Sequence, residues 1–239
     1  CRIIKSGKHV LVEKPFCLDI KDAESLIDLS NKYDTNLMVG HVLLFHPAIQ
    51  AIKKLIDNKK IGKLQYIYSN RLNLGQIRTE ENVFWSLAPH DISIFQFITN
   101  SSPSSIHCQG SSFLQKGIHD STITQLKYDN GVEGHIFVSW LHPFKEHRLT
   151  IIGSEAMLTF EDSAENKPLK LYSKKFDMSS GIPKKYDGPI EVIEYEKRMP
   201  LTEELKYFCN HLKNKKPKIA NGVHALENTK ILVAASQQL

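Results

Sequence analysis

The chain has 239 residues, of which 41% are hydrophobic and 24% are charged, and this ordinary globular balance argues against a disordered chain. At ~150 residues per domain the length predicts one large domain or two unequal ones, and because no apolar run approaches ~20 residues, a protein that crosses the membrane by helices is excluded. The net charge of +5 is mild, and the densest basic stretch, residues 213–218, has no interleaved aromatic side chains, so we expect no nucleic-acid partner.

The first elements alternate between strand and helix. Residues 9–12 form a short apolar run that predicts a buried strand of a parallel sheet. Asp19 is placed to cap a helix, residues 37–40 predict a second buried strand, and Pro47 opens a second helix that ends near residues 58–60. Strand, helix, strand, helix is typical of a doubly wound α/β domain, and we expect only its second half in this chain.

The pattern changes at residue 61. A strand over residues 64–74 and a helix over 89–99 are followed by consecutive strand patterns, which predict an open, largely antiparallel sheet. These strand patterns are residues 105–114, 122–128, 132–140, 147–153 and 156–161. Asn130-Gly131 predicts a hairpin with a type I′ turn. Residues 162–189 are rich in Lys, Ser, Gly and Pro and predict a long, weakly structured excursion.

Two helices, residues 201–212 and 223–239, are predicted to finish the chain. The predicted fold class is therefore α/β plus α+β. Residues 1–60 would be the C-terminal half of a Rossmann domain, and residues 61–239 an α+β domain for substrate binding and oligomerisation. The chain starts at Cys1, inside what reads as the last turn of a helix, so we interpret it as a fragment whose own N-terminus lies upstream.

The cysteines and histidines indicate the cellular compartment of the protein and whether it binds a metal. Cys1, Cys17, Cys108 and Cys209 form no Cys-x-x-Cys pair, which fits a reducing cytosol and predicts a cytoplasmic protein. The eleven histidines form no His-Glu-x-x-His motif, so we expect no metal.

Three groups of residues carry candidate chemistry. Glu13-Lys14-Pro15 directly follows a predicted strand, where ligands of open α/β sheets bind, although a surface ion pair is the simpler explanation of such a sequence. Pro89 suits the first position of a helix, which would place His90 in the first turn, where the helix dipole keeps an imidazole neutral. Arg71 and Asn73 would share one face of a strand, either to contact a polar substrate or simply to meet solvent, and Arg78 follows shortly after.

At these residues the sequence resembles the Gfo/Idh/MocA oxidoreductases. The run Gly-Lys-His-Val-Leu-Val-Glu-Lys-Pro at residues 7–15 is similar to the family signature, and residues 39–41, 61–62 and 149–156 also fit. Residues 46–48, 71–75 and 85–91 look most like the nucleotide-sugar branch. That branch oxidises the 3-hydroxyl of UDP-N-acetylglucosamine or its uronic acid with NAD.

The resemblance implies a role for each candidate residue. The cofactor-binding residues would be Glu13, Lys14, Pro15 and His41. The substrate-binding residues would be Lys14, Arg71, Asn73, Trp85, Ser86 and His90. Lys14 and His90 would be catalytic, the cofactor would be NAD, with NADP left open, and the protein would form a homodimer or homotetramer.

Two departures from the family pattern stand out. Ser86 occupies a position where the family often has an aspartate. The Gly-rich pyrophosphate turn is missing, so by family analogy we expect about 75–80 further residues upstream and weak NAD binding by the chain as given.

The expected reaction is oxidation of a secondary alcohol by hydride transfer. A neutral His90 can accept the hydroxyl proton at pH 7, whereas a lysine, with a pKa of ~10.4, is better suited to stabilising the alkoxide that develops. We therefore expect His90 to be the base and Lys14 an electrostatic clamp. The alternatives are a related enzyme acting on a free sugar or polyol, or a non-catalytic binding or oligomerisation protein.

We also expect an apolar face of the open sheet, with Phe113, Ile136, Val138 and Trp140, to form a subunit interface.

Overall fold

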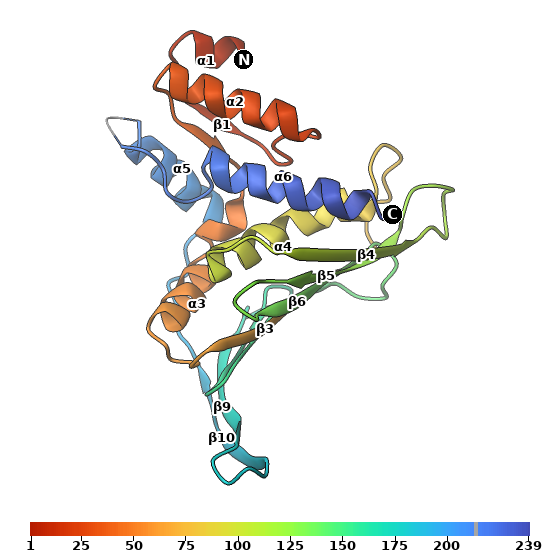
Figure 1. Ribbon diagram of the computed structural model, residues 1–239, viewed down its shortest axis with the longest axis vertical. Coiled ribbons are helices and arrows are strands. Elements are labelled where there is room, and N and C mark those ends of the chain that lie inside the picture. Colours follow the sequence, from red (N-terminus) through yellow and green to blue (C-terminus); the bar gives the residue numbers. More distant parts are fainter. Residues whose placement is uncertain (213–214) are drawn as a thin grey trace.

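The computed structural model describes residues 1–212 and 215–239 and contains two sheets (Figure 1). Residues 213 and 214, which begin the basic stretch, lie outside the described residues. The smaller sheet has two strands and the larger has eight. None of the helices in the described ranges is long and apolar enough to cross a membrane.

The small sheet has the predicted strand–helix–strand order. After the short helix α1 (Arg2–Lys5), strand β1 (Val10–Val12) pairs in parallel with β2 (Leu37–Val39). Helix α2 (Ile20–Lys32) joins them and is capped by Asp19, whose carboxylate accepts hydrogen bonds from the Lys21 and Asp22 N–H groups. This N-terminal portion confirms the predicted α/β pattern.

A 3₁₀ turn, η1 (Val42–Phe45), and helix α3 (Pro47–Asp57) lead from the small sheet to the large one. Pro47 stands at the first helical position as predicted, and the His46 ring caps the helix by accepting a hydrogen bond from the Ala48 N–H.

The large sheet runs in the order β10-β9-β8-β7-β3-β6-β5-β4, and every neighbouring pair is antiparallel except β3 and β6. Its strands are β3 (Leu64–Leu72), β4 (Ser105–Ser111), β5 (Ser121–Lys127), β6 (Glu133–Ser139), β7 (Glu146–Gly153), β8 (Met157–Glu161), β9 (Leu169–Asp177) and β10 (Lys184–Val192). The largely antiparallel open sheet is confirmed.

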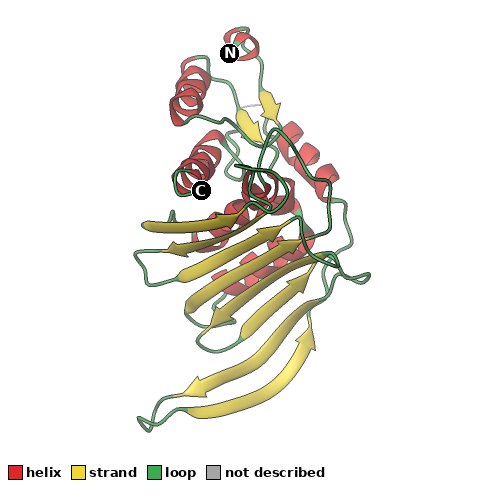
Figure 2. Ribbon diagram, turned by 90° about the vertical axis from the view of Figure 1, so that its right-hand side faces the viewer, coloured by secondary structure: helices red, strands yellow, loops and turns green. Residues whose placement is uncertain are grey.

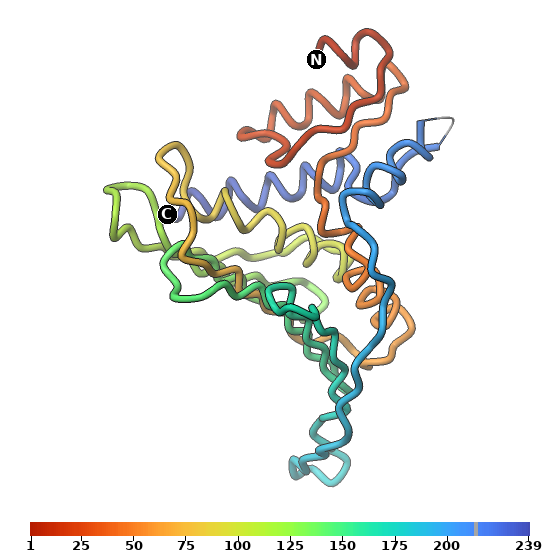
Figure 3. Tube along the Cα trace, turned by 180° about the vertical axis from the view of Figure 1, so that it is seen from behind, coloured from red at the N-terminus to blue at the C-terminus, as the bar shows by residue number. Residues whose placement is uncertain are grey.

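Helices cover one face of this sheet and connect it to the small one. Helix α4 (Val83–Thr99) packs on the sheet, and α6 (Gly222–Ser236) lies between α4 and α2 (Figure 1). The Asn228 amide on α6 donates to the Pro89 carbonyl on α4 at 3.1 Å. Helix α5 (Pro200–Asn210) packs on η1, and Figure 3 shows the extended segment 193–199 returning from β10 past α3 to reach it.

Helix α4 begins earlier than predicted. It starts at Val83, capped by the Asn82 side chain, so Pro89 lies inside the helix and His90 is not in its first turn. Val83 and Phe84 are fully buried, and their burial stabilises the extra N-terminal turns although Pro89 removes one backbone hydrogen bond.

The stretch predicted as a weakly structured excursion, residues 162–189, contains β9 and most of β10, which form a hairpin. Figure 2 shows it extending the sheet at its far edge. Leu169 and Leu171 are buried, and β9 pairs with β8, so sheet pairing overrides the weak strand propensity of the Lys- and Ser-rich sequence.

Two finer predictions are also corrected. The hairpin at Asn130-Gly131 forms, but only Gly131 has a positive φ, so its turn is not type I′. Ile136, Val138 and Trp140 do not line an open face: they are buried under the helices, and only Phe113 is exposed. Side chains alternate along a strand, so the open face carries the other set, including His135 and Phe137.

Candidate active site

The site lies where β1 and β2 end. Val12 is paired with Val39, so the Glu13-Lys14 pair and Gly40-His41 leave the sheet at the same edge. Gly40 leaves room for the Glu13 carboxylate, because a Cβ at this position would lie 3.1 Å from Glu13 Oε2.

Lys14 connects this edge to α4. Its Nζ donates a hydrogen bond of 2.9 Å to the Ser86 carbonyl, and Ser86 and His90 lie one turn apart on the same side of α4. The structure therefore brings together the two residues predicted to be catalytic. Burial lowers the pKa of Lys14; the Glu81 and Glu13 carboxylates oppose this shift, and nearby arginines add to it.

His90 is half-buried, and its Nδ1 atom is buried with no partner among the described residues. Burial lowers its pKa well below the usual value, and the cations Arg71 and Lys14 lower it further. His90 is thus neutral at pH 7 as predicted, but for a different reason, because it lies too far along α4 to feel the N-terminal dipole.

Arg71 is buried behind His90. Its Nε and Nη2 donate to the two Asp91 oxygens at 2.7 and 3.1 Å, and its Nη1 lies 3.3 Å from His147 Nδ1. Only 8% of Arg71 is exposed, so the guanidinium holds α4 against β3 and has little left to offer a substrate. Asn73 is half-buried just beyond the end of β3, beside Gly75.

His41 is the most deeply buried of the predicted site residues. Neither ring nitrogen has a partner within the described part of the chain, and its ring centroid lies 5.6 Å from that of His224. Burial, with His224 and Lys14, lowers the pKa of His41 to about 3. An unpartnered buried N–H costs ~1–3 kcal/mol, a cost that a bound polar group would remove. His41, Glu13 and Lys14 therefore fit the nicotinamide end of a cofactor.

Trp85 and Ser86 stand beside Lys14 at the N-terminal end of α4. The indole is half-buried and fixed by a 2.8 Å hydrogen bond from Nε1 to Ser236 Oγ. Ser86 accepts the hydrogen bond from Lys14 through its backbone carbonyl. Serine and the aspartate often found there in the family both have this carbonyl, so the contact does not depend on which of the two is present.

Sequence reasoning missed several ionisable groups around the site. Glu81 is the carboxylate with the largest effect on Lys14, and His224 and Glu204 come from the last two helices. Glu204 and His224 lie far from the motif residues in sequence, so no spacing could have linked them. Glu81 stands just before Trp85, and its closeness to the motif at residues 85–91 was the one signal that could have found it. The described residues hold no group of three or more His, Cys, Asp or Glu side chains suited to a metal ion.

Comparison with known proteins agrees with a nucleotide-dependent oxidoreductase. Residues 1–41 match the model described as "Oxidoreductase family, NAD-binding Rossmann fold", and residues 49–159 match the Gfo/Idh/MocA C-terminal domain. The chain belongs to the Gfo/Idh/MocA family of oxidoreductases.

Its relatives act on different sugars and polyols. UDP-N-acetylglucosamine 3-dehydrogenase of Acidithiobacillus ferrooxidans is 25% identical over 98% of this chain and 71% of its own length. Its solved structure superposes with a TM-score of 0.85 at 23% identity, covering 99% of this chain and 72% of that one. Myo-inositol 2-dehydrogenase of Thermotoga maritima is 24% identical over 91% of this chain and 66% of its own length.

Proposed function

We propose that the protein is an NAD-dependent dehydrogenase that oxidises a secondary hydroxyl of a sugar, namely C3 of a UDP-N-acetyl-hexosamine or its uronic acid. The observation that carries the proposal is the meeting of Lys14, from the end of β1, with the face of α4 that bears His90. The similarity to UDP-N-acetylglucosamine 3-dehydrogenase supports the choice of substrate.

In this proposal Glu13, Lys14, Pro15 and His41 hold the nicotinamide end of the cofactor. When bound, the nicotinamide supplies the acceptor for the hydride. NAD is the proposed cofactor. The substrate screen includes NADP because the acidic residue that reads the ribose 2′-hydroxyl follows the Gly-rich turn in such domains and is not among these four residues.

In the proposed reaction, His90 accepts the proton of the substrate hydroxyl and Lys14 stabilises the negative charge on its oxygen. Nδ1 of His90 is buried, so its Nε2 is the atom assigned to accept the proton. The Lys14 ammonium has three donors and gives one to the Ser86 carbonyl, which leaves two for the oxygen on which negative charge develops. Trp85, Ser86 and Asn73 border the substrate, and Arg71 acts through His90.

A substrate screen tests the function. The protein expressed from its complete reading frame is incubated with NAD or NADP and with UDP-N-acetylglucosamine, its uronic acid, free N-acetylglucosamine or myo-inositol, and the absorbance of the reduced cofactor is followed. We expect turnover of a UDP-sugar with NAD. Turnover of myo-inositol alone would make it a polyol dehydrogenase, and failure with all four, together with no binding of either cofactor, would favour the non-catalytic alternative.

Cell location and assembly complete the proposal. All four cysteines are free thiols, which supports a reducing, cytoplasmic location. We propose a homodimer or homotetramer built on the open face of the large sheet.

A further inference from the structure

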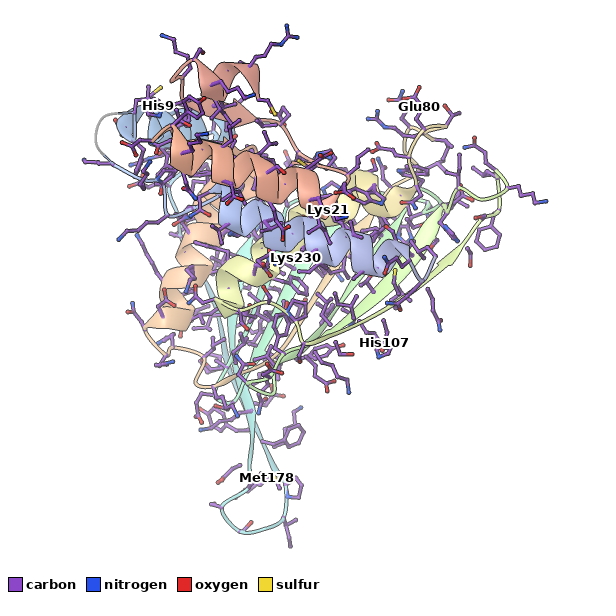
Figure 4. All side chains as sticks on the ribbon, turned by 45° about the horizontal axis from the view of Figure 1, so that its top comes forward. His9, Lys21, Glu80, His107, Met178 and Lys230 are labelled. Atoms are coloured by element: carbon purple, nitrogen blue, oxygen red, sulfur yellow. The ribbon has the colours of Figure 1, made fainter. Side chains whose placement is uncertain are left out.

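A separate pocket of about 680 Å³ opens beside Trp85. It lies between the loop that follows Glu13-Lys14-Pro15, the loop before α4 and the β4–β5 loop; its lining residues are Leu18, Arg78, Thr79, Glu80, Glu81, Asn82, Trp85, Gly117 and Ile118. Figures 1 and 4 show the loop bearing Glu80 standing out at the end of the sheet, near the C-terminal end of α6. The volume is typical of a site for a ligand larger than one sugar ring, since such sites span ~300–1,000 Å³.

The walls of this pocket are held in place by hydrogen bonds. Gln115 Nε2 donates to the Arg78 carbonyl at 3.0 Å and so ties the β4–β5 loop to the loop before α4. The Asp120 carboxylate accepts from the Phe113 and Leu114 N–H groups at 2.6 and 3.0 Å. Because the Trp85 indole is also fixed, by Ser236, the pocket is a preformed site.

Three kinds of side chain meet in the pocket. Trp85, with Leu18 and Ile118, offers an aromatic and apolar surface on which a nucleobase can stack. Glu80 and Glu81 offer carboxylates, the group that binds ribose hydroxyls in dinucleotide folds. Arg78 offers a guanidinium that is 54% exposed. Its one carboxylate partner among the described residues is Glu81, 3.3 Å from its Nε, so its terminal N–H groups remain available to a phosphate.

We propose that this pocket binds the nucleoside diphosphate part of the substrate, with the base on Trp85, the ribose diol at Glu80 and Glu81, and the diphosphate at Arg78. The pocket adjoins Lys14 through the Trp85-Ser86 peptide, so the sugar attached to the diphosphate reaches Lys14 and His90. This inference rests on the proposed function, because it supposes a nucleotide-sugar substrate.

Titration with UDP tests the pocket without any catalytic turnover. Binding is measured calorimetrically, together with acrylamide quenching of tryptophan fluorescence. Of the two tryptophans, Trp140 is 2% exposed and Trp85 is half-buried, so UDP should reduce quenching by shielding Trp85. We expect Arg78→Ala to weaken UDP binding about tenfold or more, through loss of a charge-assisted contact to phosphate. We expect dUDP to bind more weakly than UDP because it lacks one ribose hydroxyl.

Arg198→Ala is the matched control. Arg198 has the same 54% exposure and two carboxylate partners, Glu203 at 3.3 Å and Glu196, but it lies in a different groove, between α3 and α5. UDP affinity should be unchanged in this variant, and both variants should melt near the wild-type temperature.

The possible failures are distinct. If UDP binds the wild type but Arg78→Ala binds it equally well, or if Arg198→Ala is the weakened variant, the pocket is wrongly assigned although the substrate class stands. If UDP neither binds nor inhibits while a free sugar or polyol is oxidised, the nucleotide-sugar function itself is wrong.

Discussion

Burial and nearby cations lower the pKa of both candidate catalytic side chains, Lys14 and His90. The shift makes a neutral imidazole the dominant form of His90 at pH 7, where it can accept a proton. It also brings Lys14 nearer to neutrality, so mutation and pH together must separate their roles.

Replacing either residue by alanine should lower turnover by ~10²–10⁴-fold while changing the affinity for the nucleotide sugar little, because acid–base groups act mainly in the transition state. In the wild type, turnover should fall as pH drops through the lowered pKa of His90. That acidic limb should be absent in His90→Ala and present in Lys14→Ala, as measured by turnover against pH. If it survives in His90→Ala and disappears in Lys14→Ala, the two roles are reversed.

Glu204 provides a test of pH-dependent stability. It is 1% exposed, its Oε1 has no partner within the described chain, and burial together with Glu13 raises its pKa to about 7. A raised carboxyl pKa means that the folded state favours the protonated form, so the contribution to stability is full below the unfolded pKa of ~4.3 and is lost as pH rises through 7.

Glu204→Gln should therefore be close to the wild type near pH 4.5 and exceed its free energy of unfolding by ~3–4 kcal/mol at pH 8, as measured by urea denaturation at both pH values. Glu203→Gln is the control, because Lys206 and Arg198 lower the pKa of Glu203 and so reverse the sign of any pH effect. Equal stability of Glu204→Gln and the wild type at pH 8 would contradict the prediction.

At the scale of elements, the ion pair between Arg71 on β3 and Asp91 on α4 fixes the helix that carries His90. Both side chains are less than 10% exposed. Buried ion pairs add little net stability compared with apolar residues of similar size, but removal of one partner leaves the other charge buried without compensation. The pair is therefore expected to position α4 and, through the Arg71 cation, to keep His90 neutral.

Asp91→Asn should cost ~3–5 kcal/mol of unfolding free energy, and the double variant Arg71→Met/Asp91→Leu should cost less than the sum of its single changes. Urea denaturation of the wild type, Arg71→Met, Asp91→Leu and the double variant gives the coupling, and Asp91→Asn is measured beside them. Asp57→Asn is the control: Asp57 on α3 is 54% exposed, pairs with Lys53, and its replacement should cost under ~0.5 kcal/mol. A cost for Asp91→Asn as small as that of the control would show that the buried pair does not anchor α4.

At the scale of the whole molecule, no helix formed by the described residues covers one face of the large sheet (Figure 2). Aromatic side chains gather there: Tyr68 stacks on His135 at 5.1 Å, the Tyr66 hydroxyl lies 2.6 Å from His135 Nδ1, and Ile123 is 43% exposed opposite Phe137. Such a face favours a partner, and a second copy of the chain fits the expected homo-oligomer.

We expect light scattering to give the mass of a dimer or tetramer at micromolar concentration, and Phe137→Lys to reduce it to that of a monomer, because a charge cannot be buried in the contact without a partner. Phe144→Lys, at a loop residue that is 60% exposed, is the control and should leave the mass unchanged. A monomeric wild type, or a Phe137→Lys protein that keeps the full mass, would count against this interface.

Local signals in the sequence were sufficient for much of this protein. Short apolar runs, the Asp19 cap and Pro47 determine the strand–helix–strand–helix start, because caps and buried strands depend on near neighbours in the chain. The motif at residues 7–15 identified the family. The roles that the resemblance implies for Lys14 and His90 stay predictions.

Only the tertiary structure decided how these residues act. Pairing with β8 ordered a hairpin that composition disfavours, and burial of Val83 and Phe84 extended α4 past Pro89. The same packing turned Arg71 toward Asp91 and lowered the pKa of His90 by burial and not by a helix dipole. Desolvation and nearby charges shift a pKa, and both come from groups that lie far apart in the chain. The sequence therefore supplies the chemical groups of the site, while the fold sets their protonation states and which of them contact one another.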